Sequence, residues 1–408
     1  MRHLELLSPA GSMEALQAAL RFGADAVYAG GPQLQLRAGS AGFTMDMLAD
    51  AAREVHARGR KLYVTVNAFP TNREIDALGD YAQALLALGA DAAIVADLGA
   101  IAAMRKAAPG LPIHVSTQAN CVNYAAARAY CDMGATRVVL GREMTLDDIA
   151  ELRAKVPVEL ELEAFVHGAM CMAYSGRCLI SAYLTGRSAN RGGCAHSCRW
   201  NYALMEEKRP GEFLPVEEDA RGTTILSSFD LNCLDFLDRI AAAGVTSFKL
   251  EGRMKSPYYV ATVTNAYRRR IDGMLSGDAS DASLALLRRE LDAASHRAYA
   301  SGFYFGEMKN HAPDDGTYLS DCRFVGTVVA RLPGGRIRVE LRNRIGEGDA
   351  LEVLSPNVLG LSFPAARIAG ADGTPLPEAT VPMALYDMDA PEGVEAGDLL
   401  RVRCHENN

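Results

Sequence analysis

Over its first 270 residues, this chain regularly alternates short apolar β-type runs with amphipathic helical stretches, and this alternation restricts the possible fold classes. Such alternation is typical of βα units around a parallel sheet. Because eight runs are present and no GxGxxG fingerprint follows any of them, the sequence predicts a (β/α)8 TIM-like barrel rather than an open doubly wound sheet. The runs lie at residues 4–8, 26–30, 61–69, 92–96, 113–118, 137–141, 158–166 and 247–252.

The helical stretches between these runs carry recognisable end signals. Ser12, Thr44 and Thr145 each stand where an N-cap is expected, and Gly59 stands where a helix ends. A capping hydroxyl accepts a hydrogen bond from a free N–H in the first turn, and a glycine readily takes the left-handed conformation that closes the last turn. These signals predict short, discrete helices rather than one long coiled coil.

The seventh and eighth β-type runs are separated by about eighty residues, which interrupt the rhythm. We expect this segment to form a cysteine-rich insertion (167–235) over the barrel mouth, inside a barrel domain covering 1–310. A hairpin is predicted within it about the turn Arg209-Pro210-Gly211. From residue 320 the composition shifts to Gly, Pro and alternating residues, which predicts a small β-barrel domain over 320–408.

Composition bounds the compartment and the partners. The chain has 408 residues, 49% of them hydrophobic, with no secretory signal pattern and no run of eighteen apolar residues. These properties predict a cytoplasmic protein that does not enter membranes, in which nine cysteines stay reduced, bind metal or act in catalysis. A net charge of −8 restricts any nucleic-acid site to a local patch.

Five of the nine cysteines lie close together in the sequence, at Cys171, Cys178, Cys194, Cys198 and Cys233. Neither a pair of CxxC knuckles nor a Cys/His pattern of the usual zinc sites is present. Thiolates from separated loops suit a [4Fe–4S] cluster, which needs one sulfur at each corner and tolerates long intervals between ligands. On spacing alone, a cluster, a zinc ion and unliganded structural cysteines all remain open.

Three segments together resemble peptidase family U32, the collagenase-like peptidases: EAFVHGAMCMAYSGRC (163–178), FKLEGRMKSPYYVA (248–261) and EEKRPGEF (206–213). The opening ELLSPAGSMEAL and AVYAGG are also similar to that family. Within it, GGCAHSCRW (192–200) resembles the tRNA-hydroxylating branch. The resemblance covers nearly the whole chain.

That resemblance implies hydroxylation of the wobble uridine of tRNA to 5-hydroxyuridine, without molecular oxygen and with prephenate as the hydroxyl donor. Related branches hydroxylate 23S rRNA or the ubiquinone ring, the latter as paired iron–sulfur proteins. A collagenase-like peptidase is the other reading. No HExxH or GxSxG motif supports it, and Cys171 with His167 is the thiol–imidazole pair that this reading would use.

The resemblance also implies a [4Fe–4S] cluster held by Cys171, Cys178, Cys194 and a fourth cysteine near SFDLN (228–232). The family pattern places that cysteine directly after the DL pair, whereas Asn232 fills the slot in this chain and Cys233 follows it. Cys233 is the expected fourth ligand, and Cys198 is the alternate.

Residues at the carboxyl ends of barrel strands are the default candidates for binding and catalysis. A doubly carboxylated donor needs fixed cations, so we expect Arg142 and Arg253 to contact it. Acid–base roles are predicted for Glu163, His167 and Glu251, and an ion-pair ring that closes the barrel is the alternative. The remaining candidates for substrate binding are Asn67, Gln118, Glu143 and Lys249, with Asp97 also at a strand end.

A possible RNA contact lies in GRIRVELRNR (335–344), where apolar and polar residues alternate. If the strand ran through the segment, one face would carry all four of its arginines and the other would be apolar. Such a face suits a phosphate backbone, and an ordinary solvated strand is the alternative. The four residues are Arg336, Arg338, Arg342 and Arg344.

Overall fold

The computed structural model describes residues 4–35, 42–170, 180–187, 195, 197, 204–205, 213–214, 217–219, 222–224, 229–277, 280–306 and 318–404. The chain divides into two compact units. The first comprises Met1–Leu20, Ala24–Val260 and Arg297–Tyr318. The second comprises Arg21–Gly23, Ala261–His296 and Leu319–Asn408.

The first unit is a closed parallel barrel of eight strands, as the sequence predicts. Each strand pairs in parallel with the next, and β13 closes the ring by pairing with both β7 and β1. The strands are β1 (Glu5–Ala10), β2 (Ala26–Gly30), β3 (Lys61–Val66), β4 (Ala92–Val95), β5 (Ile113–Val115), β6 (Ala135–Val139), β7 (Glu161–Ala169) and β13 (Ser247–Leu250).

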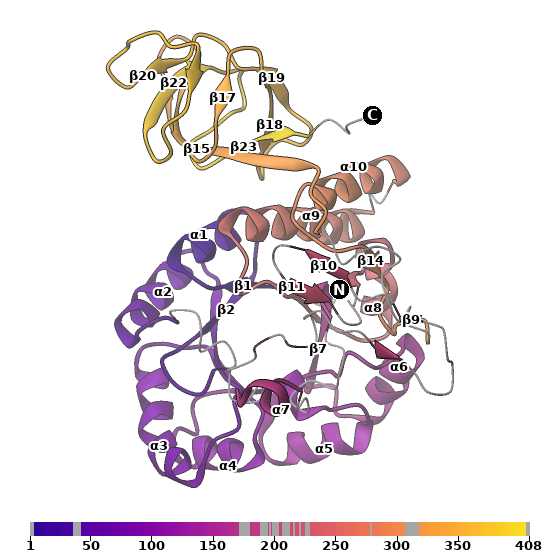
Figure 1. Ribbon diagram of the computed structural model, residues 1–408. Helices are drawn as coiled ribbons and strands as arrows, with labels where there is room; N and C mark the ends of the chain where they lie inside the picture. The colour runs from indigo at the N-terminus through magenta and orange to yellow at the C-terminus, as the bar shows by residue number, and fades with distance from the viewer. Residues whose placement is uncertain are drawn as a thin grey trace. The chain divides into compact units, whose positions relative to one another are not determined.

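Helices surround this ring, as Figure 1 shows for α1 to α6. Their starts follow the predicted caps: the Thr44 and Thr145 hydroxyls accept from first-turn N–H groups, and Ser12 Oγ accepts from Ala15 N. Gly59 follows α2 with φ +65°, the left-handed conformation predicted for it. The helices of this unit are α1 (Met13–Arg21), α2 (Met45–Ala57), α3 (Asn72–Ala87), α4 (Leu98–Ala107), α5 (Tyr124–Asp132), α6 (Leu146–Lys155) and α8 (Leu237–Ala242). Most of α9 (Pro257–Ser276) belongs to the second unit.

The barrel strands are buried along most of their length because helices cover the outside and side chains fill the inside. Inward apolar residues form one compact cluster on the β1 to β4 side: Leu7, Ala26, Tyr28, Tyr63, Ala92 and Ile94. On the other side of the interior, β6, β7 and β13 carry the buried charged residues Arg137, Glu163 and Lys249, so this side differs from an ordinary apolar barrel core.

Additional elements attach to the carboxyl half of β7. Strand β12 (Asp230–Asn232) pairs antiparallel with β7, and β14 (Tyr299–Ala300) pairs parallel with β12. The predicted hairpin is present as the antiparallel pair β8 (Leu204–Met205) and β9 (Phe213–Leu214), while its turn lies outside the described residues. The shorter elements are α7 (Ile180–Thr185), β10 (Glu217–Asp219), β11 (Gly222–Thr224) and the 3-10 turns η1 (Thr117–Ala119) and η4 (Leu234–Phe236).

The second unit contains an antiparallel half-barrel sheet of seven strands, in the order β19-β18-β23-β15-β16-β22-β20, which confirms in part the small β-barrel domain predicted for this region. The elements are α10 (Asp281–Asp292), β15 (Cys322–Leu332), β16 (Arg336–Leu341), β18 (Ala350–Leu354), β19 (Ser362–Pro364), β20 (Ala369–Gly370), β22 (Leu385–Asp389) and β23 (Leu399–Arg403), with β17 (Ile345–Gly346) paired to β21 (Glu378–Ala379).

The predicted arginine strand is shorter than expected. Its alternation holds in β16, where Ile337, Val339 and Leu341 are buried. The strand then ends, because the N–H groups of Arg342 and Asn343 both donate to the carbonyl of Val325. Arg342 and Arg344 therefore lie beyond the strand, and the prediction of one face with four arginines is wrong for these two.

None of the helices within the described ranges is long and apolar enough to span a membrane.

Candidate functional site

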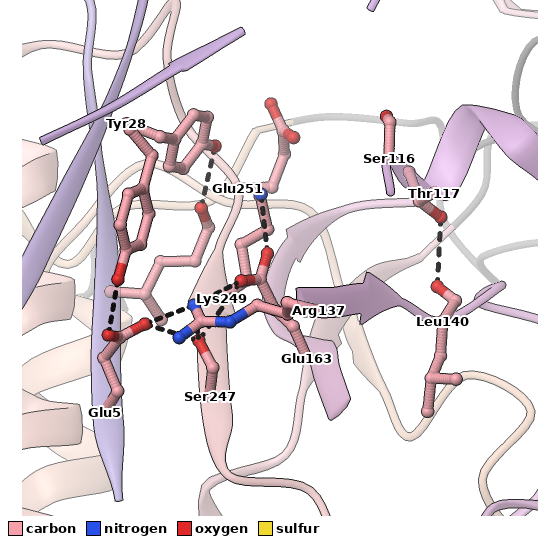
Figure 2. A network of polar contacts seen from close by, with 12 residues as sticks. Glu5, Tyr28, Ser116, Thr117, Arg137, Leu140, Glu163, Ser247, Lys249 and Glu251 are labelled. Atoms are coloured by element: carbon pink, nitrogen blue, oxygen red, sulfur yellow. Dashed lines mark hydrogen bonds and ion pairs between the residues drawn. The ribbon is translucent and has the colours of Figure 1, made fainter. Parts of the chain in front are cut away.

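A network of buried charges crosses the interior of the barrel (Figure 2). The Arg137 guanidinium on β6 donates to Glu5 on β1 at 2.5 Å and to Glu163 on β7 at 3.0 Å. Lys249 on β13 donates to the other oxygen of Glu163 at 2.7 Å, and Ser247 bonds to both Glu5 and Glu163. Four strands are thereby joined through side chains across the barrel.

Burial and this network set the protonation of the neighbouring groups. Burial tends to raise the pKa of Glu5, but the Arg137 charge and hydrogen bonds from Arg137, Tyr63 and Ser247 lower it overall. The phenol of Tyr63 donates to Glu5 at 2.7 Å, and burial raises its pKa well above the usual range. Burial, with nearby Arg137, holds the pKa of His114 well below its ordinary value, so this imidazole is neutral at pH 7.

Glu163 and Lys249 lie within this network. Glu163 is fully buried and Lys249 is 4% exposed. Their contacts among the described residues are those of the ion-pair alternative rather than of a carboxylate facing Arg142 or Arg253. The Lys249 ammonium also lies 4.5 Å from the ring centre of Tyr28, a cation–π contact.

Above the network, Arg253 occupies the carboxyl end of the barrel. Its Nη1 donates to the Thr65 hydroxyl at 2.7 Å, and the residue is buried. A Cβ on Gly30 would lie 2.7 Å from that Nη1 and 1.9 Å from Oε1 of Gln35, and a Cβ on Gly11 would lie 2.0 Å from the Arg253 carbonyl. The glycines after β1 and at the end of β2 therefore make room for Arg253.

Arg142 lies at the same end of the barrel, after β6. Its guanidinium carbon is 3.9 Å from the centre of the Phe165 ring, and its Nη1 donates to the Ala169 carbonyl at 2.8 Å. The other amino group lies 3.5 Å from the Glu251 carboxylate. Figure 2 shows Glu251 beyond Lys249 along this side of the barrel. Glu251 and Arg142 thus form an ion pair at the carboxyl end of the barrel.

Several buried polar atoms at this end have no hydrogen-bond partner within the described part of the chain. They include four acceptor oxygens, on residues that follow β3, β5 and β6, and the donor Nε of Arg142. We call the four acceptor residues the acceptor arc: Asn67, Gln118, Asn120 and Glu143. Buried polar atoms are nearly always bonded in folded proteins, so such a concentration indicates a place where a ligand or water completes the bonding.

His167 lies near the end of β7, where the register with β13 shifts. It is 1% exposed, and its ring centre is 5.5 Å from that of Tyr299 and 6.2 Å from that of Tyr259. The predicted acid–base residue is therefore enclosed by aromatic rings.

Cys233 is the one candidate cluster ligand among the described residues; Cys171, Cys178, Cys194 and Cys198 lie outside them. It is fully buried, and its N–H donates to the carbonyl of Val166 on β7. The Tyr304 phenol, which donates to the Phe165 carbonyl, is within electrostatic range of both Cys233 and Arg142. Burial raises the pKa of the Cys233 thiol well above its ordinary value.

This position fits a cluster ligand in one respect: β7 leads directly into Cys171, and β12 brings Cys233 alongside that strand. Asn232, which fills the family's cysteine slot, pairs with His167. Within the described ranges, no group of three His, Cys, Asp or Glu side chains could hold a metal ion. Any cluster must therefore draw further ligands from the residues outside those ranges.

The four arginines predicted to contact RNA all have acidic partners. Arg338 forms a bidentate pair with Asp387, and Arg342 lies 2.7 Å from Glu340. The other two pairs are Arg344 with Glu378 at 2.6 Å and Arg336 with Asp389 at 3.9 Å. Their charge is thus partly balanced within the unit, which leaves a weaker cationic face than the sequence suggests.

One residue predicted at a strand end has a different role in the structure, and several residues of the site were not predicted from the sequence. The Asp97 carboxylate caps α4 by accepting from Ala100 N, so its strand-end position serves the helix. Glu5, Arg137 and Asn120 were not predicted, because none of them stands at the carboxyl end of a predicted strand. The alternation of Glu and Leu through 159–163, with inward carboxylates on a buried strand, was the signal that could have revealed the interior network.

A parallel eight-stranded α/β barrel with polar groups gathered at the carboxyl ends of its strands defines a protein of the TIM-barrel class, in which that end binds ligands. The profile described as Peptidase family U32 matches residues 11–313, and that of the Peptidase family U32 C-terminal domain matches residues 320–401. The chain belongs to peptidase family U32.

Relatives within this family have different names. The chain is 36% identical to "tRNA hydroxylation protein P" of Escherichia coli, over 98% of this chain and 96% of that protein. It is 35% identical to "tRNA hydroxylation protein P1" of Bacillus subtilis, over 97% and 94% of the two chains. It is also 35% identical to "Collagenase" of Porphyromonas gingivalis, over 74% of each.

Proposed function

We propose that this protein is an iron–sulfur enzyme that hydroxylates tRNA, replacing the C5 hydrogen of the wobble uridine with a hydroxyl group taken from a prephenate-like donor. The donor takes up that hydrogen in place of its hydroxyl group and is reduced by the two electrons that the uridine loses. The observation that carries the proposal is the similarity to tRNA hydroxylation proteins over nearly the full length of both chains. The match to the relative named a collagenase covers a smaller share of each chain.

The barrel mouth supplies the chemistry that an anionic donor requires. Arg253 is held over Gly30 by Thr65, and a buried guanidinium binds carboxylates through two parallel hydrogen bonds. Arg142 is a second cation, already near Glu251 and packed on Phe165. A doubly charged donor would therefore bind through Arg253, with Arg142 nearby, while the acceptor arc remains for another substrate.

The proposed cofactor is a [4Fe–4S] cluster on Cys171, Cys178, Cys194 and Cys233, with Cys198 as the alternate fourth ligand. Such a cluster would supply electron transfer or substrate positioning. Cys233 adds a thiol that is fully buried beside β7, a setting that shields a metal–sulfur bond from water. His167, Glu251 and Glu163 remain candidates for acid–base roles, and His167 and Glu251 lie nearest the mouth.

A peptidase remains the competing function. A nucleophilic cysteine needs a lowered pKa beside a cation or imidazole, whereas burial raises the pKa of Cys233. The alternative nucleophile for a peptidase is Cys171, with the His167 imidazole as its base. A Cys171→Ser variant that keeps a full cluster but loses cleavage of a collagen-like peptide would favour the peptidase.

Two experiments test the proposal. The first expresses the chain in a host strain whose tRNA contains no hydroxylated uridine, followed by mass spectrometry of the digested tRNA. We expect a uridine derivative 16 mass units heavier with the wild type and a strong loss with Arg253→Met, whereas Arg58→Met, an exposed arginine of the α2 C-cap, keeps the product. Absence of the product with the wild type contradicts the proposal.

The second experiment measures iron and sulfide after anaerobic purification of the wild type, Cys233→Ser and Cys198→Ser. About four irons and four sulfides per chain are expected for a [4Fe–4S] cluster. Loss in Cys233→Ser alone would assign the fourth ligand, and loss in Cys198→Ser alone would transfer that role. Zinc in place of iron, in protein kept anaerobic throughout, contradicts the proposed cofactor.

A further inference from the structure

The acceptor arc is built by the loops that follow β3, β5 and β6. The loop after β5 is fixed to the end of β6: the Thr117 hydroxyl donates to the Leu140 carbonyl, and Gly141 N donates to the Cys121 carbonyl. Figure 2 shows the Thr117 to Leu140 contact. A Cβ on Gly141 would lie 3.0 Å from Oε2 of Glu143, so this glycine gives the carboxylate its position over the strand end.

Asn120 lies in this arc as the C-cap of η1, in the left-handed conformation (φ +52°, ψ +48°) that asparagine adopts more readily than most residues other than glycine. Its N–H donates to the Thr117 carbonyl, which fixes the backbone at this point. The side-chain oxygen of Asn120 is buried without a partner in the described part of the chain, as is that of its neighbour Gln118. The local backbone therefore holds these acceptors in place although no described residue bonds to them.

The arc has the opposite hydrogen-bonding character from the Arg253 side of the mouth. Within the described residues it offers four acceptor oxygens without a partner, one of them on the Glu143 carboxylate, and the Arg142 Nε is a donor without a partner. The carboxylates of an anionic donor molecule have no hydrogens to give these acceptors, and the Glu143 charge repels them. The complementary ligand is neutral and carries N–H and O–H groups plus one acceptor.

We propose that the acceptor arc binds the target uridine itself, with the Glu143 carboxylate accepting the hydrogen bond of the base N3–H. This inference rests on the proposed function and names the part of the mouth that recognises the RNA substrate. Uridine presents the N3–H and the ribose 2′-hydroxyl as donors, and O4 as an acceptor for Arg142 Nε. A bond from N3–H to a carboxylate is charge-assisted and hence the strongest of the set.

The same arrangement rejects cytidine, because its N3 is an acceptor and would face the Glu143 carboxylate. Sites built to accept a hydrogen bond discriminate strongly against analogues that lack the donor, since the buried acceptor is then left unpaired. Glu143 is thus a specificity-determining residue, and the amide oxygens of Asn67, Gln118 and Asn120 are left for the ribose.

The test combines two changes, a substitution of Glu143 and methylation of the uridine N3, and it measures RNA binding rather than turnover. Fluorescein-labelled tRNA anticodon stem-loops carry uridine or 3-methyluridine at the wobble position, and fluorescence anisotropy gives Kd for the full-length protein purified anaerobically. The variants are Glu143→Ala, which removes the acceptor, and Glu143→Gln, which keeps an acceptor oxygen. Glu151→Ala is the matched control, since Glu151 is an exposed glutamate on α6.

For the wild type and Glu151→Ala we expect 3-methylation to weaken binding about tenfold, the usual effect of losing one buried hydrogen bond. Glu143→Ala should bind the uridine stem-loop about tenfold more weakly and show less than a twofold effect of the methyl group. Glu143→Gln should retain most of the wild-type affinity and most of the methyl effect.

An equal methyl effect in the wild type and in Glu143→Ala overturns the assignment to Glu143, as does a wild type that is indifferent to methylation. Either result leaves tRNA binding, and so the proposed function, intact. If the wild type binds the stem-loop no better than a hairpin of scrambled sequence, both the inference and the tRNA substrate are contradicted. Circular dichroism melting of each variant checks that the fold is unchanged.

Discussion

Glu163 offers the sharpest test of how the barrel interior is held together. It is fully buried, and its two oxygens bond to Lys249 at 2.7 Å and to Arg137 at 3.0 Å. In Glu163→Gln, Arg137 keeps Glu5 and Glu161 as carboxylate partners. Lys249, in contrast, has no second carboxylate partner among the residues that the structure describes. The variant therefore leaves a buried ammonium ion without its counter-charge.

Breaking one side of a buried ion pair costs about 3 to 5 kcal/mol. The Tyr28 and Phe165 rings lie 4.5 and 5.5 Å from the ammonium of Lys249 and offset part of that cost. We therefore expect Glu163→Gln to lower the free energy of unfolding by about 3 kcal/mol. Adding Lys249→Met should restore at least half of it, because a buried pair replaced by uncharged groups of similar size is often neutral.

Equilibrium unfolding in urea, followed by far-UV circular dichroism, measures these differences as shifts of the transition midpoint. Glu151→Gln is the control, because the Glu151 to Lys155 pair is exposed on α6 and should contribute less than about 0.5 kcal/mol. The reasoning is refuted if Glu163→Gln matches the wild type, or if the double variant is less stable than the single one.

Two further outcomes follow from the same contacts. Gly30→Ala places a Cβ 2.7 Å from Arg253 Nη1. We expect this variant to raise the KM for the anionic donor about tenfold, which is the effect of weakening one charged contact. Gly110→Ala is the control, because its Cβ meets only ordinary van der Waals contacts and should leave the KM unchanged. The pKa of Glu5 is lower in the folded protein than in the unfolded chain. The ionised Glu5 therefore stabilises the fold at pH values above its unfolded pKa of about 4.3, and this stabilisation is lost as the pH falls through its lower folded pKa. Between about pH 5 and pH 3, the urea unfolding midpoint should therefore fall less in Glu5→Gln than in the wild type. An equal fall of the midpoint in the two proteins would contradict this.

The barrel itself was predictable because each of its strands is marked locally. A run such as 26–30, apolar and bounded by turn residues, became β2 with the same limits. The caps at Thr44 and Thr145 also depend on neighbouring residues alone, and they appear as predicted. The strand over 113–118 was predicted too long, because Ser116 turns the chain into η1 by accepting from Gln118 N.

The parts that could not be predicted depend on residues far apart in the sequence. The Arg137 to Glu5 contact joins positions 132 residues apart, and Glu163 to Lys249 joins positions 86 apart. No local pattern states which carboxylate meets which cation inside a barrel. Likewise, the acidic partners of the β16 arginines come from other strands, so their partial neutralisation appears only in the folded unit.

The most direct test of the proposed function is the source of the added oxygen. The host strain lacking hydroxylated uridine, complemented with this chain, is grown under ¹⁸O₂, and its tRNA nucleosides are analysed by mass spectrometry. We predict a hydroxylated uridine that depends on this chain and contains no ¹⁸O, because the hydroxyl group comes from the carboxylated donor. Incorporation of ¹⁸O, or tRNA that is the same with and without the chain, would contradict the account.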